Sequence, residues 1–313
     1  MKLDAAKRAA INAMITVRVP ASTANLGPAF DCLGLALDLW NETQIEFEGK
    51  KLFIEIKGEE VSAIPGDESN LTVRAFLRIH EELGERASSG LHILCAQNIP
   101  INGGLGSSAA AIASGLLAAN ALLGNPMSLE TLLQLGAAME GHADNLAAVL
   151  FGGLVLVTEE NGRYRAQKLE CAQLRAVVVA PDIELRTPES RRALPPKVLM
   201  ANAVFNIGRS LQVAEALRSG DIAALSVAMQ DKLHQPYRLP LIPGAAEAIH
   251  AAQQAGAAAA VSGAGPSIIA FVEEGREKAI TEVLRAPFAE RGVKTRHYLL
   301  SSTPAGASIQ IDH

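Results

Sequence analysis

Apolar and polar residues alternate along the first part of the chain with the period of two that half-buried β-strands show. The alternation covers residues 15–22, 33–40, 43–48 and 52–58, and we expect an early antiparallel set of strands there. Residues 91–100 predict another strand. The patterned sequence begins at Met14, so the residues before it, 1–13, are expected to form an appended leader.

Helical spacing follows. Apolar residues recur every three or four positions after Asn70, which is a residue type that often caps a helix N-terminus. An alanine-rich helix is expected over 107–123 and another over 128–141. Strands then return over 151–159 and 174–182, and the second of these has the continuous β-branched run of a buried strand.

The last third of the chain has a different character. Its pattern predicts helices over 188–195, 204–220, 221–231, 243–256 and 277–292, and strands over 257–274 (with a glycine turn) and 293–302. Strands and helices mix without regular βαβ alternation, so an α+β fold is favoured over a doubly wound sheet. We expect two domains, 14–175 and 176–313.

Composition narrows the possible functions. The 313 residues are 49% hydrophobic. The chain has 28 basic and 33 acidic residues, and its net charge of −5 does not indicate binding to nucleic acid or to an anionic membrane. The N-terminus lacks the apolar core of a signal peptide, and the longest apolar stretch is too short to span a membrane. Three cysteines without metal-ligand spacing are expected to be buried, unpaired thiols. These features predict a cytoplasmic protein.

A glycine-serine turn before the alanine-rich helix is the most informative segment. Glycines let the backbone approach a ligand closely, and a helix N-terminus offers free N–H groups to phosphate. It is not a Walker A loop, because no Gly-Lys-Ser/Thr follows. A capped helix start without any ligand is the alternative interpretation. The candidate nucleotide-binding residues are Pro100, Ile101, Asn102, Gly103, Gly104, Leu105, Gly106, Ser107, Ser108, Ala109 and Ala110.

Two other segments carry small residues around a few polar ones. PASTANLGPAFDCLGLA, from residue 20, holds Asn25 and Asp31 between two apolar strands, which suits a substrate pocket or an ordinary capped turn. AAAVSGAGPS, from residue 258, contains Gly263 and allows close approach by another loop or a phosphate. Taken alone, it would be interpreted as a β-hairpin turn.

In their order and spacing, the three segments together resemble the three signature motifs of the GHMP kinases, over essentially the whole chain from Met14. The resemblance implies a ribosomal protein S5 domain 2-like N-terminal domain and a ferredoxin-like C-terminal domain. It also implies ATP and Mg²⁺ as cofactors, and family members are often homodimers.

Within the family, the details are most similar to the members that phosphorylate L-homoserine. EGHADN at 140–145, TPESRRALP at 187–195 and DKLHQPYR at 231–238 match segments of that group. One departure is Pro28-Ala29, where the glycine of a GFD sequence is usual. The implied reaction is ATP-dependent formation of O-phospho-L-homoserine for threonine biosynthesis. A kinase for a mevalonate-type alcohol and a non-catalytic ligand sensor of the same fold are the alternatives.

The resemblance also assigns candidate roles to residues. Arg191 and Arg238 would bind the substrate carboxylate, which suits the guanidinium fork. Asn25 and Asp31 would hold the amino and hydroxyl end. Mg²⁺ would bind between Ser108 and Glu140, and adenine would lie near Asn70. Thr187 would hydrogen-bond the reacting hydroxyl, Gly263 would lie at the substrate, and His142 would support the residues that contact it. Asn145 stands where mevalonate kinase-like members have a catalytic aspartate.

Overall fold

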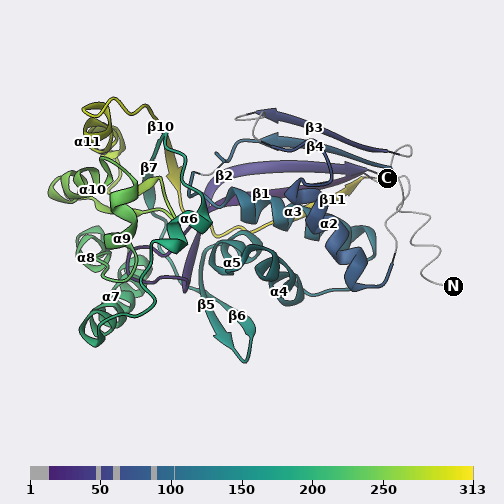
Figure 1. The fold of residues 1–313 in the computed structure, drawn as a ribbon, viewed down its shortest axis with the longest axis horizontal. Helices are drawn as coiled ribbons and strands as arrows, with labels where there is room; N and C mark the ends of the chain where they lie inside the picture. Colours follow the sequence, from purple (N-terminus) through teal and green to yellow (C-terminus); the bar gives the residue numbers. More distant parts are fainter. Residues whose placement is uncertain (1–13, 47–50, 59–63, 86–89, 102, 313) are drawn as a thin grey trace.

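The computed structural model describes residues 14–46, 51–58, 64–85, 90–101 and 103–312. The expected leader and Asn102 therefore lie outside the described residues. The chain forms two sheets with their helices, placed side by side (Figure 1).

The first sheet has seven strands, in the order β11-β1-β2-β4-β3, with β5 and β6 extending from β2. Their bounds are β1 Met14–Ala24, β2 Leu33–Glu46, β3 Leu52–Gly58, β4 Leu91–Gln97, β5 Leu154–Glu160, β6 Arg163–Leu169 and β11 Ser308–Asp312. Helices lie on one side of this sheet in Figure 1. They are α2 Leu71–Glu82, α3 Ser107–Leu122, α4 Leu129–Glu140 and α5 Asp144–Phe151. Of these, α3 and α5 pack directly against β1 and β2.

The expectation of two separate strands at 33–40 and 43–48 was wrong, because β2 runs unbroken from Leu33 to Glu46; residues 47 and 48 lie outside the described residues. Its first five residues are buried, and alternation begins only later in the strand. The pairing register with β1 also shifts opposite this change of pattern, between Pro20 and Ala21. The expectation of an all-antiparallel set also fails, since β3 pairs parallel to β4.

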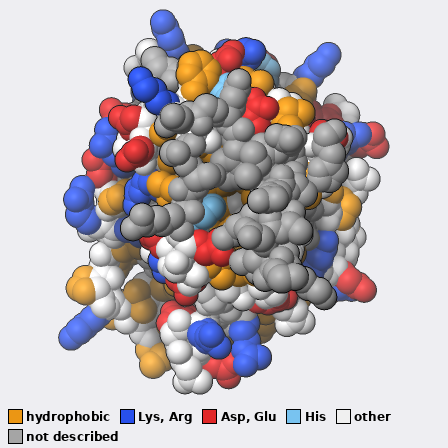
Figure 2. Space-filling model, turned by 90° about the vertical axis from the view of Figure 1, so that its right-hand side faces the viewer, with side chains coloured by type: hydrophobic (Ala, Val, Ile, Leu, Met, Phe, Trp, Pro, Cys, Tyr) orange, Lys and Arg blue, Asp and Glu red, His pale blue; other side chains and the backbone are white. Residues whose placement is uncertain are grey.

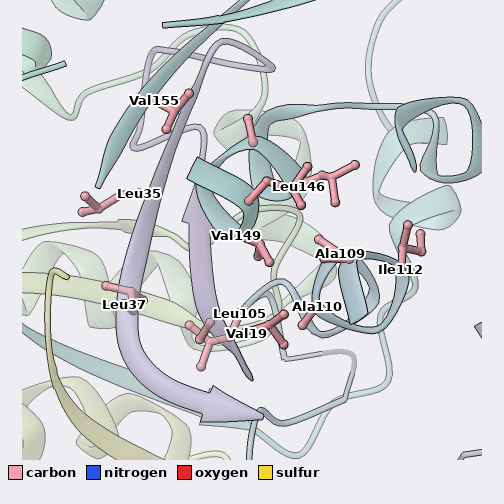
Figure 3. Close-up of a cluster of buried hydrophobic side chains, with 14 of the residues drawn as sticks. Val19, Leu35, Leu37, Leu105, Ala109, Ala110, Ile112, Leu146, Val149 and Val155 are labelled. Atoms are coloured by element: carbon pink, nitrogen blue, oxygen red, sulfur yellow. The ribbon is translucent and has the colours of Figure 1, made fainter. Parts of the chain in front are cut away.

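The core of this half is built around α3, which is buried on almost every side. Its small residues let neighbouring elements come close: a Cβ added at Gly115 would lie 2.1 Å from the backbone oxygen of Thr72 in α2. Figure 3 draws Ala109 and Ala110 of α3 among the buried side chains of this core. The alanine-rich composition therefore reflects tight packing of the helix that carries the glycine-serine turn.

The second sheet has the order β10-β7-β9-β8 and is antiparallel throughout. Its strands are β7 Arg175–Pro181, β8 Ala258–Val261, β9 Ile268–Val272 and β10 Thr295–Ser301. The accompanying helices are α6 Thr187–Arg192, α7 Met200–Ser219, α8 Ile222–Ala228, α9 Gln235–Arg238, the 3-10 turn η2 Leu239–Leu241, α10 Ala245–Gln254 and α11 Glu277–Ala289. Helices between β7 and β8, and α11 between β9 and β10, give the split βαβ arrangement of ferredoxin-like folds. The predicted α+β class and C-terminal topology are confirmed.

The two halves are joined by more than one crossing of the chain. After β10 the chain returns to the first sheet, where β11 pairs antiparallel with β1. Backbone bonds from Thr303 to Ala36 and from Gly153 to Thr303 tie the crossing segment down. The expected domain boundary, at residues 175 and 176, falls at the start of β7 and stays a prediction. In Figure 1, α6 lies between the halves.

Three surface properties were also expected from the sequence. Within the described residues, no helix combines the length and apolar character needed to cross a membrane. The three cysteines are unpaired as predicted, but the expectation of buried thiols was wrong: Cys32 is exposed, and Cys95 and Cys171 are half-buried. On the face drawn in Figure 2, basic and acidic side chains are interspersed, in keeping with the small net charge.

Candidate functional site

The three glycine-containing segments meet at the junction of the two halves. The Thr23 hydroxyl lies 2.9 Å from the Ser262 hydroxyl, which in turn donates to the Gly104 carbonyl at 2.6 Å. Gly104 has a φ of +68°, and an added Cβ would lie 2.4 Å from the Ser262 carbonyl oxygen. Only glycine fits this contact, so the glycine in the middle segment is needed for docking on the last one.

Asn25 connects the first and last segments. Its side-chain amide donates to the Gly263 carbonyl at 2.7 Å, while its amide oxygen accepts from the backbone N–H of Asp31 at 2.9 Å. Both ends of the amide are therefore engaged with backbone groups. Asn25 itself adopts a φ of +68°, a conformation that asparagine tolerates better than most residues. In this structure, Asn25 therefore stabilises the loop that carries Asp31.

The N-terminus of α3 opens into the same junction. Gly106 caps it in the left-handed conformation, and an added Cβ would lie 2.1 Å from the Ser22 hydroxyl. That hydroxyl donates to the amide oxygen of Asn145 at 2.9 Å. The side chains of Leu105, Ala109 and Ala110 lie in the core, so these positions can offer a ligand only backbone groups (Figure 3).

Two cavities open on this helix terminus. The smaller has a volume of about 80 Å³ and is lined by Asn25, Asp31, Gly104, Gly106, Ser107, Ser108, Glu140, His142, Asp144, Asn145, Leu185, Thr187, Arg191, Arg238 and residues 263–265. The larger has a volume of about 550 Å³ and runs from α3 along β3 and β4. Six residues line both cavities: Ser107, Ser108, Glu140, His142, Thr187 and Arg191. The cavities are therefore adjoining, with the α3 N-terminus and α6 at their boundary.

The larger cavity has an apolar wall with a few polar groups. Its apolar members include Ile54, Ile56, Ile93 and Met139. Asn70, predicted to lie near adenine, lines this cavity, but its amide is occupied, because its oxygen caps α2 at Thr72 and its nitrogen donates to the Pro65 carbonyl. Ile101 also lines this cavity, whereas Pro100 and Gly103 line neither.

The smaller cavity is strongly polar, and both predicted arginines reach it. Arg191 donates to the two carboxylate oxygens of Asp31 at 2.9 and 2.8 Å. Arg238 is only 1% exposed, and among the described residues no carboxylate lies within salt-bridge distance of it. Burial and the neighbouring Arg191 lower the pKa of Arg238 to about 10, so it remains charged at neutral pH. The cavity thus holds one paired and one unpaired guanidinium.

A second cluster lies at the end of α4 and the start of α5. Burial, opposed by the charge of His142, raises the pKa of Glu140 to about 7, and one carboxylate oxygen is buried without a hydrogen-bond partner. A hydrogen bond from Ser108 to the carboxylate and the charge of Arg191 also act against this rise in pKa. Burial opposes protonation of His142, but its 3.0 Å hydrogen bond with Asp144 and the charge of Glu140 raise its pKa.

Sequence reasoning undervalued several residues of this site. Asp144 accepts the Asn145 N–H at 2.7 Å, as a structural residue would, but it also lines the smaller cavity. Leu185, just before α6, was not singled out. Ser22 lies within the first motif, so its place there was the available signal for its contact with Asn145. Among the described residues, no group of three or more His, Cys, Asp or Glu side chains forms a metal site.

Comparison with known proteins decides the family. The model for the GHMP kinase N-terminal domain matches residues 70–153, and the model for the GHMP kinase C-terminal domain matches residues 213–290. The chain belongs to the GHMP kinase family.

Several curated proteins that are similar over most of the chain are named homoserine kinase. Homoserine kinase of Moorella thermoacetica is 44% identical over 283 residues, covering 90% of this chain and 95% of that protein. Homoserine kinase of Desulfitobacterium hafniense is 38% identical, covering 95% of this chain and all of that protein. Homoserine kinase of Synechococcus sp. is 40% identical, covering 96% and 97%.

Solved structures agree on the GHMP kinase fold. Homoserine kinase from Cytophaga hutchinsonii superposes with a TM-score of 0.83 at 31% identity, covering 95% of this chain and 97% of that one. L. major mevalonate kinase, solved with R-mevalonate, has a TM-score of 0.71 at 17% identity, covering 92% and 96%. The second likeness shows a common fold alone.

Proposed function

We propose that this GHMP kinase transfers the terminal phosphoryl group of ATP to the side-chain hydroxyl of L-homoserine, giving O-phospho-L-homoserine and ADP on the route to threonine. The main support for this reaction is the pair of adjoining cavities that share the N-terminus of α3. One is large and apolar, and the other is small and charged. Curated homoserine kinases about 40% identical over most of the chain support the same reaction.

ATP fits the larger cavity. Its apolar wall on β3 and β4 suits a purine ring, and the free N–H groups of the α3 N-terminus suit the triphosphate. Ser107 and Ser108 add hydroxyl groups at the boundary with the smaller cavity. The terminal phosphate of a nucleotide bound in this way would lie at the boundary, where a second substrate can reach it. Phosphoryl transfer depends mainly on such positioning and on charge stabilisation.

L-Homoserine fits the charges of the smaller cavity. A free amino acid brings one carboxylate and one ammonium group, and the cavity offers cationic and anionic partners for both. Arg238 has no carboxylate partner among the described residues, so its charge is available to the substrate carboxylate. Asp31 and Asp144 can accept from the ammonium group. The side chain of the substrate would then extend toward Thr187 and the boundary with the nucleotide.

Ser108 and Glu140 fit the requirements of Mg²⁺. The buried Glu140 oxygen without a partner is a hard anionic ligand that lacks compensation within the protein. Mg²⁺ is commonly held by one or two protein oxygens together with phosphate and water, and it neutralises charge on the transferring group. Ser108 and Glu140 would hold the ion at the boundary between the cavities.

The site lacks a carboxylate at the position where mevalonate kinase-like members have a catalytic aspartate. Asn145 lies there, and its amide oxygen accepts from Ser22, so it cannot remove a proton from the substrate. We infer that the reaction depends on alignment of the hydroxyl by Thr187 and on stabilisation of the phosphoryl group, without a dedicated carboxylate base. Asn145 would help to orient the hydroxyl.

Two alternative functions account for fewer features of the site. A mevalonate-type substrate also has a carboxylate and a primary hydroxyl, but it has no ammonium group for Asp31 and Asp144. A non-catalytic sensor would not need the buried Glu140 carboxylate beside Ser108, which costs stability when charged.

The direct test of the proposed reaction is the identity of its product. ³¹P NMR of a reaction with ATP and L-homoserine should show a phosphomonoester signal that coincides with that of O-phospho-L-homoserine. ADP without this ester would reject the assignment.

We further propose that the chain pairs with a second copy through α7, which lies at the outer edge of the C-terminal half (Figure 1). Met200, Val204, Ile207 and Leu211 recur at helical spacing on one side of α7 and are 61–79% exposed. Gly208, beside Ile207, has nothing within 4 Å of an added Cβ. A two-fold axis between Ile207 and Gly208 would bring each isoleucine over the partner's glycine, so this face is complementary to itself.

A further inference from the structure

The buried histidine at the start of α9 makes two opposed hydrogen bonds that fix its protonation. Its Nε2 lies 2.7 Å from the Gly27 carbonyl oxygen, and its Nδ1 lies 3.2 Å from Nη1 of Arg238. A carbonyl can only accept and a guanidinium can only donate. The His234 ring is therefore neutral, with its proton on Nε2 and a lone pair on Nδ1 directed at Arg238.

Among the residues that the structure describes, the hydrogen-bond acceptors of Arg238 are all neutral. Its Nη1 donates to Nδ1 of His234 and to the Gly263 carbonyl at 3.0 Å, while its Nε has no partner. A carboxylate in the place of His234 would neutralise part of the guanidinium charge, whereas an imidazole lone pair fixes its orientation and leaves the charge intact. Burial of His234 also lowers its pKa, which keeps the lone pair available at neutral pH.

The surroundings of His234 are rigid. Asp231 accepts the backbone N–H groups of His234 and Gln235 at 2.9 and 2.6 Å, which fixes the turn into α9. The Phe30 ring stacks on the imidazole at a centroid distance of 5.3 Å and an interplanar angle of 28°. The same phenyl ring lies 5.2 Å from the Arg238 guanidinium carbon. His234 therefore links the first motif loop to the arginine through groups that have little freedom to move.

We propose that His234 is a positioning residue for substrate binding: as a neutral Nε2–H imidazole, it aims the Arg238 guanidinium at the carboxylate of homoserine. The inference rests on the proposed function, since it assumes an amino-acid substrate held by Arg238. His234 contacts no part of the substrate in this arrangement, and its effect passes through the arginine.

Two isosteric variants separate this role from a merely structural one. His234→Asn places a side-chain oxygen near the position of Nδ1, so it can still accept from Arg238 but cannot reach Gly27. His234→Gln places an amide nitrogen near the position of Nε2, so it can still donate to Gly27 but offers Arg238 no acceptor at the Nδ1 position. A positioning role predicts that H234Q raises the KM for homoserine about tenfold while H234N raises it much less, with the KM for ATP unchanged in both.

The opposite ranking, or equal changes in the two variants, would overturn the proposal and identify His234 as a tether for the Gly27 loop. Nitrogen chemical shifts of ¹⁵N-histidine in the unmodified protein give a test that needs no variant. They should show His234 protonated at Nε2 alone, and protonation at Nδ1 would equally reject the proposal. Absence of homoserine turnover by the unmodified protein would instead reject the proposed function.

Discussion

Arg191 and Asp31, 160 residues apart, form a two-bonded ion pair across the two halves of the molecule, at 2.9 and 2.8 Å. Both residues line the smaller cavity, and the sequence predicted both as substrate ligands. A zwitterionic amino acid carries the same two charges as this pair. Its carboxylate can bind Arg238 and Arg191 while its ammonium group binds Asp31. The ion pair therefore holds the site in a charge-balanced form before substrate enters.

Removal of the carboxylate should weaken selection for an amino group. In Asp31→Asn, we expect the KM for homoserine to rise about tenfold or more, because a charge-assisted hydrogen bond to the ammonium group is lost. The inhibition constant of 4-hydroxybutyrate, which lacks the amino group, should change much less. Steady-state kinetics with this competitive inhibitor measure the ratio. A ratio equal to that of the unmodified protein would exclude Asp31 from ammonium recognition.

Loss of the unpaired guanidinium should affect one substrate only. Arg238→Leu is expected to raise the KM for homoserine roughly 30-fold or more, the cost of leaving a carboxylate without its buried charged partner. The KM for ATP should stay near its original value, since Arg238 lines only the smaller cavity. Arg192→Leu is the matched control, because Arg192 is exposed and lines neither cavity. Equal changes in both KM values would exclude Arg238 as a substrate ligand.

Glu140→Gln should alter the dependence on magnesium. The amide keeps the size of the side chain but removes the anionic oxygen that has no partner in the protein. We expect kcat to fall at least tenfold and the Mg²⁺ concentration for half-maximal activity to rise, since amides are weaker ligands for this ion. A titration of activity against free Mg²⁺ at saturating ATP tests this. An unchanged midpoint would reject the metal role.

The same carboxylate should make stability depend on pH when Mg²⁺ is chelated. Its pKa is raised from 4.5 to about 7, so between these values the folded protein binds the proton more readily than the unfolded chain does. The contribution of Glu140 to stability is therefore present at acid pH and is lost as the pH rises through 7. Relative to Glu140→Gln, the unmodified protein should lose on the order of 3 kcal/mol between pH 4.5 and pH 8. Urea unfolding of both proteins with chelator measures the difference, and parallel pH profiles would contradict it.

The exposed apolar face of α7 predicts the oligomeric state. Ile207→Glu should convert a dimer to a monomer, because it places a charge at the centre of the proposed two-fold contact. Gln212→Glu is the control, since Gln212 is exposed on the same helix but lies away from the apolar face. Analytical ultracentrifugation distinguishes the two states. A monomeric unmodified protein, or a dimer that persists in Ile207→Glu, would show that this face is not the interface.

The fold was predictable because its main signals are local. Period-two and helical patterns located most strands and helices, and Asn70 was correctly predicted as a cap of α2. β11 was missed because its five residues are all exposed and its place beside β1 depends on the return of the chain. The parallel pairing of β3 with β4 has no local signature either.

The candidate site was predictable as a set of motifs but not as a set of contacts. The resemblance to the family motifs implied that Asn25, Asp31 and Gly263 belong to one substrate site, and all three line the smaller cavity. The sequence could not indicate that the Asn25 amide is hydrogen-bonded to backbone groups, because this depends on how close Gly263 of the other half comes to Asn25 in the folded chain. The sequence also could not show that the side chains of Ala109 and Ala110 are buried while those of Ser107 and Ser108 line the cavities, because both pairs follow the same glycine turn.

The most direct measurement is the specificity of ADP release with L-homoserine, mevalonate and galactose assayed in parallel at saturating MgATP. The cavity charges predict that kcat/KM for L-homoserine exceeds that for either other alcohol by at least 100-fold, since only homoserine satisfies both the guanidinium and the carboxylate of the small cavity. Robust turnover of mevalonate or galactose without homoserine-dependent ADP release would contradict the account.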